Sequence, residues 1–114
     1  MHKLTALRLY FHHSARIEPR SLWHRLSLPT VTSHLVKHAH DLGIAQVVVH
    51  HVQSGYLEGD KPRHRHVEHA HHKLPHCIEL IDVESKLRAF WQSHEPQLRN
   101  VRALFLPCEA ASVS

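Results

Sequence analysis

Hydrophobic and polar positions in the first half of the chain predict a strand followed by a helix. Residues 3–11 (KLTALRLYF) mix aliphatic, aromatic and polar side chains, as strands do. The next periodic segment has its apolar positions at helical spacing, at Val31, Leu35, Ala39 and Leu42. This spacing predicts an amphipathic helix that begins near Pro29 and ends before Gly43, where a C-cap glycine is typical.

The second half of the chain repeats this order. The β-branched run 44–52 (IAQVVVHHV) predicts a second strand, and 74–81 (LPHCIELI) predicts a third. Asp82 is suited to the N-cap position of a second helix. The apolar positions of that helix are Val83, Leu87, Phe90 and Trp91. Pro96 ends the helix, and 101–106 (VRALFL) predicts the last strand.

These elements predict an α+β fold. The order β-α-β-β-α-β is that of a ferredoxin-like sandwich, with a four-stranded antiparallel sheet and two helices on one face. A chain of 114 residues has room for one domain. We place this domain at residues 1–107 and expect a flexible C-terminal tail at 108–114. Residues 12–28 are expected to connect the first strand to the first helix.

Segment 53–73 separates the second strand from the third. It contains two glycines, a proline and a concentration of charged residues, which predicts a long loop or a hairpin extension. Structureless loops of this length are uncommon in compact domains, so the length itself indicates a function.

The strands are apolar on both sides. In 47–49 and 104–106, neighbouring residues that project to opposite faces of the sheet are all apolar. Two helices cover only one face, and a sheet whose other face meets water alternates apolar and polar residues. Exposed apolar surface forgoes about 25 cal/mol per Å². We therefore expect a homo-oligomer that buries the second face. The alternative is that residues 12–28 cover this face within one subunit.

Composition narrows the class of protein and its partners. A hydrophobic fraction of 42% is typical of a folded protein, and no apolar run reaches the roughly 18 residues that span a bilayer. The first residues lack the apolar segment of a secretory signal, and Cys77 and Cys108 do not form a disulfide framework. We therefore expect a cytoplasmic protein without membrane insertion. The net charge is +4, but Lys and Arg are scattered, so a nucleic-acid partner is not expected.

Histidine is the unusual residue, with 16 copies among 114 residues. The densest group includes one carboxylate and consists of His64, His66, Glu68, His69, His71, His72 and His76. Neutral imidazole binds divalent Zn, Ni, Cu and Co, and it needs little deprotonation near pH 7. The group predicts a divalent transition-metal site in segment 53–73. The alternative is a solvated basic loop that responds to pH.

A second, weaker metal candidate lies on the first helix, whereas catalysis finds no support in the residue spacing. His34 and His38 are four residues apart, as in a two-histidine metal clamp, although an exposed polar face is the alternative. No Ser-His-Asp arrangement or phosphate-binding glycine loop is recognisable. Cys77 and His76 project to opposite sides of a strand and cannot act together as nucleophile and base. We predict that the protein is not an enzyme.

Three segments carry a family resemblance: 7–10 (LRLY), 54–56 (SGY) and above all 74–86 (LPHCIELIDVESK). The chain resembles the PII-like proteins over residues 4–106, and specifically the branch known as domain of unknown function 190. The resemblance implies a trimer of ferredoxin-like subunits. It also implies that 53–73 corresponds to the partner-contacting T-loop, with nucleotides bound between subunits near its base. At 47–52 (VVVHHV) the chain lacks the glycine-rich stretch expected there, which argues against nucleotide binding because glycines let backbone N–H groups approach phosphates.

The leading hypothesis is a regulatory or sensor protein of the PII-like type. Binding of a metal or small ligand by the loop histidines would order segment 53–73, which then contacts a protein partner such as a transporter. A second hypothesis is a metal-buffering protein similar to CutA-type relatives. A third is a metal-dependent enzyme built from the loop histidines.

Overall fold

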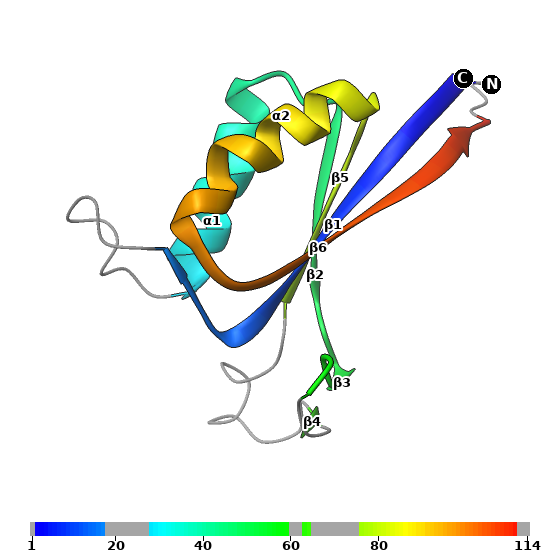
Figure 1. Ribbon diagram of the computed structural model, residues 1–114. Helices are drawn as coiled ribbons and strands as arrows, with labels where there is room; N and C mark the ends of the chain where they lie inside the picture. The colour runs from blue at the N-terminus through cyan, green and yellow to red at the C-terminus, as the bar shows by residue number, and fades with distance from the viewer. Residues whose placement is uncertain (1, 18–27, 60–62, 65–75, 112–114) are drawn as a thin grey trace.

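Four antiparallel strands form one sheet, and two helices lie against one of its faces (Figure 1). The structure is a computed structural model and describes residues 2–17, 28–59, 63–64 and 76–111. The strands are β1 (His2–Ile17), β2 (Gln46–His51), β3 (Ser54–Gly55), β4 (Arg63–His64), β5 (His76–Asp82) and β6 (Leu98–Ala110). The helices are α1 (Leu28–Asp41), α2 (Glu84–His94) and the short 3₁₀ helix η3 (Glu95–Gln97).

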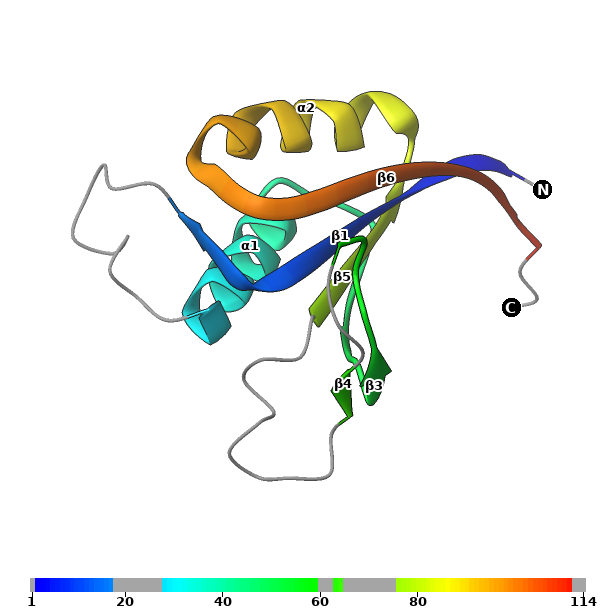
Figure 2. The same cartoon turned by 60° about the horizontal axis from the view of Figure 1, so that its bottom comes forward.

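The main sheet has the strand order β2-β5-β1-β6, and each neighbouring pair is antiparallel. β1 and β5 are therefore the central strands, and β2 and β6 are the edges. The two views agree that α1 and α2 lie on the same side of this sheet (Figure 1 and Figure 2). This arrangement confirms the predicted α+β ferredoxin-like sandwich.

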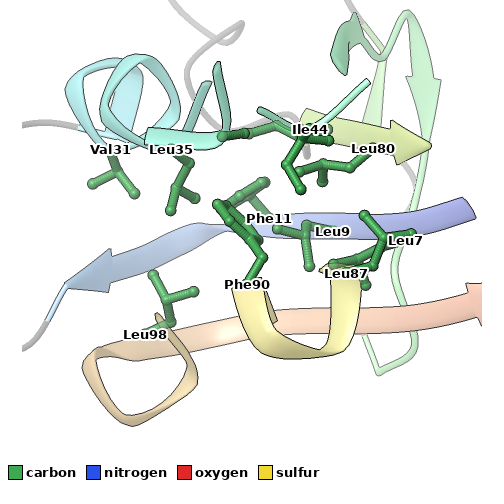
Figure 3. Close-up of a cluster of buried hydrophobic side chains, with 12 residues drawn as sticks. Leu7, Leu9, Phe11, Val31, Leu35, Ile44, Leu80, Leu87, Phe90 and Leu98 are labelled. Carbon is green, nitrogen blue, oxygen red and sulfur yellow. The ribbon is translucent and has the colours of Figure 1, made fainter. Parts of the chain in front are cut away.

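The hydrophobic core lies between the sheet and the two helices (Figure 3). Leu7, Leu9 and Phe11 of β1 have no exposed surface, so the odd-numbered residues of this strand face the helices. The helices contribute Val31, Leu35, Ala39, Leu87 and Phe90 to the same cluster. The helical stripe predicted from the sequence is thereby confirmed, except at its last position. Leu42 is 49% exposed because it follows the end of α1.

β1 and β6 are longer than predicted. β1 continues past residue 11 to Ile17, with an irregularity between Phe11 and Arg16, and Ile17 pairs with Leu98 at the start of β6. At the other end β6 reaches Ala110, which pairs with His2, so residues 108–110 belong to a strand where a tail was expected. Backbone pairing between the two strands sets these lengths. The sequence of the added segments is polar and does not have the pattern of a strand. Proline at position 107 is tolerated because β6 is an edge strand.

The end of α1 and the start of α2 lie close together, and Gly43 and Asp82 hold them there. Gly43 has a φ of 77°, which confirms its predicted role at the end of the first helix. Asp82 is not the N-cap of α2, because that position belongs to Val83. The Asp82 carboxylate instead accepts hydrogen bonds from the N–H groups of Val83 (2.6 Å) and Ala45 (2.8 Å). Lys86 joins both ends, with its Nζ 3.1 Å from Asp82 and 2.7 Å from the Gly43 carbonyl oxygen.

The segment after β2 begins as a hairpin. Ser54 pairs with His64 and Gly55 pairs with Arg63, so β3 and β4 form a small antiparallel ladder below the main sheet (Figure 1). Of the two alternatives left by the sequence, a loop or a hairpin extension, the described residues therefore show a hairpin at the stem of segment 53–73.

Candidate functional site

Most of the predicted loop ligands lie outside the described residues. These are His66, Glu68, His69, His71 and His72. His64 is described through its backbone pairing in β4. His76 begins β5, and its ring meets the ring of His51 edge-on at a centroid distance of 5.3 Å. The part of the chain that the structure describes holds no group of three or more His, Cys, Asp or Glu side chains placed to bind a metal. The loop metal site therefore stays a prediction.

The sheet has a second face, opposite the helices, which we call the open face. Its central row crosses all four strands and consists of Val48, Glu79, Arg8 and Leu104. The row on one side of it is mainly apolar and consists of Gln46, Ile81, Ala6 and Leu106. The row on the other side consists of His50, Cys77, Tyr10 and Arg102. These residues confirm that apolar side chains lie on both sides of the sheet.

An ion pair lies at the middle of the open face. Arg8 Nε donates a hydrogen bond of 2.8 Å to Glu79 Oε2, and the two residues are direct cross-strand partners in β1 and β5. Hydrogen bonding by Glu79 raises the pKa of the Arg8 guanidinium, so Arg8 carries its positive charge on this face. Val48 and Leu104, which flank the pair, are each 37% exposed. The centre of the open face is therefore a charged pair set between apolar side chains.

Cys77 also faces this side of the sheet, where it is largely buried. The residue is only 6% exposed, and burial raises the pKa of its thiol above the ordinary value. The protonated thiol is a poor nucleophile and a poor metal ligand.

The stem of the 53–73 segment contacts the far edge of the sheet. Glu58 Oε1 accepts a hydrogen bond of 2.6 Å from Arg102 Nη1 on β6. A hollow of about 300 Å³ opens beside this ion pair, and its lining consists of Tyr10, His12, Leu57, Glu58, Asn100, Val101 and Arg102. The Glu58 side chain is 82% exposed, so the ion pair adds little to the stability of the fold.

Three histidines gather on the helix layer. His38 Nδ1 and His94 Nε2 are 2.5 Å apart, and the two rings meet edge-on with centroids 4.6 Å apart. The ring of His34 lies 6.1 Å from that of His38 and 6.2 Å from that of His94. α1 therefore supplies the pair His34 and His38 that the sequence singled out, and α2 adds a third imidazole.

His94 was missed by the sequence analysis, although a signal for it exists. It lies on the buried stripe of α2, seven residues after Leu87 and four after Phe90, and it is 7% exposed. Burial, followed by the nearby imidazoles of His38 and His34, lowers the pKa of His94 to about 4. Burial also lowers the pKa of His34, with smaller effects from His38 and Lys37. His94 is therefore a neutral imidazole at pH 7.

Comparison with known proteins identifies a family that the chain matches. A family model described as "Uncharacterized ACR, COG1993" matches residues 4–106, which include every residue of the hydrophobic core. No curated protein matches the chain. Among the described residues, no helix is long and apolar enough to cross a membrane.

Proposed function

The chain belongs to this family, DUF190, a member of the PII-like superfamily, and from this premise we propose that it is a non-enzymatic regulatory protein that works as a homo-oligomer. The open face is the contact between subunits, and segment 53–73 is the element that responds to a ligand and meets a partner. The observation that carries the proposal is the apolar character of a sheet face that neither helix covers.

A second copy of the chain is the occupant that fits the open face best. Val48 and Leu104 are exposed on either side of the Arg8–Glu79 pair, and burying them between subunits gains about 25 cal/mol per Å² of apolar surface. The Glu79 side chain is only 18% exposed, and Arg8 balances its charge. A second subunit can therefore cover both charges together. The family resemblance favours three subunits.

Assembly through the open face would gather the loop segments of the subunits. β2 and β5 are hydrogen-bonded neighbours, and segment 53–73 leaves the first and returns to the second at the same end of the sheet. The β3–β4 hairpin begins this segment beside the main sheet, and the Arg102–Glu58 ion pair links its stem to β6. Histidines from several subunits can then share a divalent Zn, Ni, Cu or Co ion. Metal binding orders the segment for contact with a protein partner, for which a transporter is our candidate.

Light scattering tests the assembly. The wild-type chain is expected to have the mass of an oligomer, and Leu104→Asp is expected to have the mass of one subunit, because a carboxylate would be buried in the contact. Leu42→Asp is the matched control, since Leu42 is also exposed but lies on the helix layer. A wild-type chain that is a folded monomer in dilute solution would refute the proposal.

Limited proteolysis during a metal titration tests the loop. Ordering by Zn, Ni, Cu or Co is expected to slow cleavage within residues 53–73, and replacing His66, His69, His71 and His72 by Ser is expected to abolish this protection. Metal binding with unchanged cleavage would favour a metal-buffering protein instead. Absence of binding to all four metals would remove the metal part of the proposal and leave the assembly part intact.

A further inference from the structure

We propose that His38 and His94 form a second site for a divalent transition metal, between α1 and α2. This site lies on the helix layer, so it is separate from the open face and from segment 53–73. Neither the proposed assembly nor the proposed loop site depends on it.

The two ligand atoms already face each other across the helix pair. His38 Nδ1 and His94 Nε2 are 2.5 Å apart, although the residues are 56 positions apart in the chain. Helix packing through Phe90 holds this arrangement, since its ring lies 6.0 Å from His38 and 4.5 Å from His94. A metal bound by both nitrogens would therefore clamp α1 to α2.

Only a small movement separates the present contact from a coordinated ion. Zinc binds imidazole nitrogen at about 2.0–2.1 Å, so two tetrahedral ligands lie about 3.4 Å apart, roughly 1 Å more than the present contact. Without a metal, one nitrogen must carry a proton that points at the other. With a metal, both nitrogens of the contact present lone pairs, so the one proton between them moves to the other nitrogen of its own ring.

A hollow lies beside one of the two ligands, His38. A hollow of about 390 Å³ between the helices is lined by His38, Leu42, Ile44, Lys86, Ala89, Phe90 and Ser93. Lys86, which lines this hollow, is paired with the Asp82 carboxylate at 3.1 Å, which reduces its repulsion of a metal ion. A metal ion held by His38 and His94 would need water to complete its coordination shell, and the hollow beside His38 is the space from which water would come.

His34 is the candidate for a third ligand. It lies one helical turn from His38 on α1, and its ring is within about 6 Å of both partners. As the side chains stand, the described residues hold no group of three ready to bind a metal. The proposed site therefore has two protein ligands, and His34 joins only if its ring turns toward them.

Cobalt titration tests the site, with the loop ligands removed. The parent protein is the full chain with His64, His66, His69, His71 and His72 replaced by Ser, and Co²⁺ is followed by its visible absorption. The parent is expected to bind one Co²⁺ per subunit, and His38→Ala is expected to weaken binding at least tenfold. His40→Ala is the matched control, because His40 is exposed on α1 outside the cluster.

A second measurement guards against loss of folding. His94→Gln in the same parent is expected to lose Co²⁺ binding, with circular dichroism confirming that the helices remain. Binding that is equally tight in the parent, His38→Ala and His94→Gln would overturn the proposal. So would a folded parent that binds no Co²⁺, Zn²⁺, Ni²⁺ or Cu²⁺. The proteolysis and light-scattering tests of the proposed function use the wild-type loop and the open face. A negative result in the Co²⁺ titration therefore leaves the proposed function standing.

Discussion

Acid should destabilise this fold through His94, and the effect can be calculated from its environment. The side chain is 7% exposed, and its pKa is about 4 in the folded chain, against an ordinary value of 6.5. Between these two values the unfolded chain binds a proton that the folded chain does not. Stability is therefore complete above pH 6.5, falls as the pH drops below 6.5, and reaches its full loss below pH 4.

The size of this loss is large for a domain of this length. One pKa unit corresponds to about 1.4 kcal/mol, so the His94 contribution amounts to about 2 kcal/mol between pH 7.5 and pH 5 and about 3 kcal/mol below pH 4. Domains of this kind are stable by only about 5–15 kcal/mol. Protonation of one buried imidazole thus removes a substantial share of the stability.

Urea unfolding at pH 7.5 and pH 5 measures the effect, with EDTA present and the subunit concentration held constant. His94→Leu is expected to lose about 2 kcal/mol less than the wild type between the two pH values, because its side chain cannot bind a proton. His40→Ala, on the exposed side of α1, is the control and should follow the wild type. Equal losses in His94→Leu and the wild type would refute the reasoning, since the acid sensitivity would then come from other groups.

Three further variants probe the fold itself. Leu9→Ala removes a side chain without exposed surface from the core and is expected to cost about 2–5 kcal/mol in urea unfolding. Asp82→Ala leaves the N–H groups of Val83 and Ala45 without their acceptor and is expected to cost about 1–3 kcal/mol by the same measurement. Gly43→Ala places a Cβ at a φ of 77° and is expected to cost about 1–2 kcal/mol, seen as a lower Tm. An unchanged stability would contradict the assigned role in each case.

The layout of the fold was predictable because its main signals are local. The apolar spacing at Val31, Leu35 and Ala39, the glycine that ends that helix and the β-branched strand that follows are each readable over a few residues. Two βαβ halves in this order leave few alternatives to a ferredoxin-like sheet. The apolar character of the second face could also be predicted from the sequence, since every second residue of a strand projects to the same side.

What could not be predicted depends on contacts between distant segments. The extension of β1 to Ile17 comes from pairing with Leu98, and neither segment has a strong strand pattern by itself. The environment of His94 could not be predicted, because only the approach of α1 reveals what its ring contacts. The predicted N-cap was wrong by one residue, at Asp82 instead of Val83. The Asp82 carboxylate binds the Ala45 N–H, which comes from 37 positions away in the chain.

β1 lies between the open face and the helix layer that holds His38 and His94. Odd-numbered residues of β1 hold the helices, whereas Arg8 lies on the open face, so one strand supports both surfaces with different side chains. β1 is hydrogen-bonded on both sides, to β5 and β6, and this restrains the backbone when the open face changes. A chain kept monomeric by Leu104→Asp is therefore expected to retain the contact between His38 and His94. Histidine side-chain NMR signals of these two rings should be the same in that variant and in the wild type. Large shifts would mean that assembly shapes the helix layer, and the two sites would then be coupled through β1.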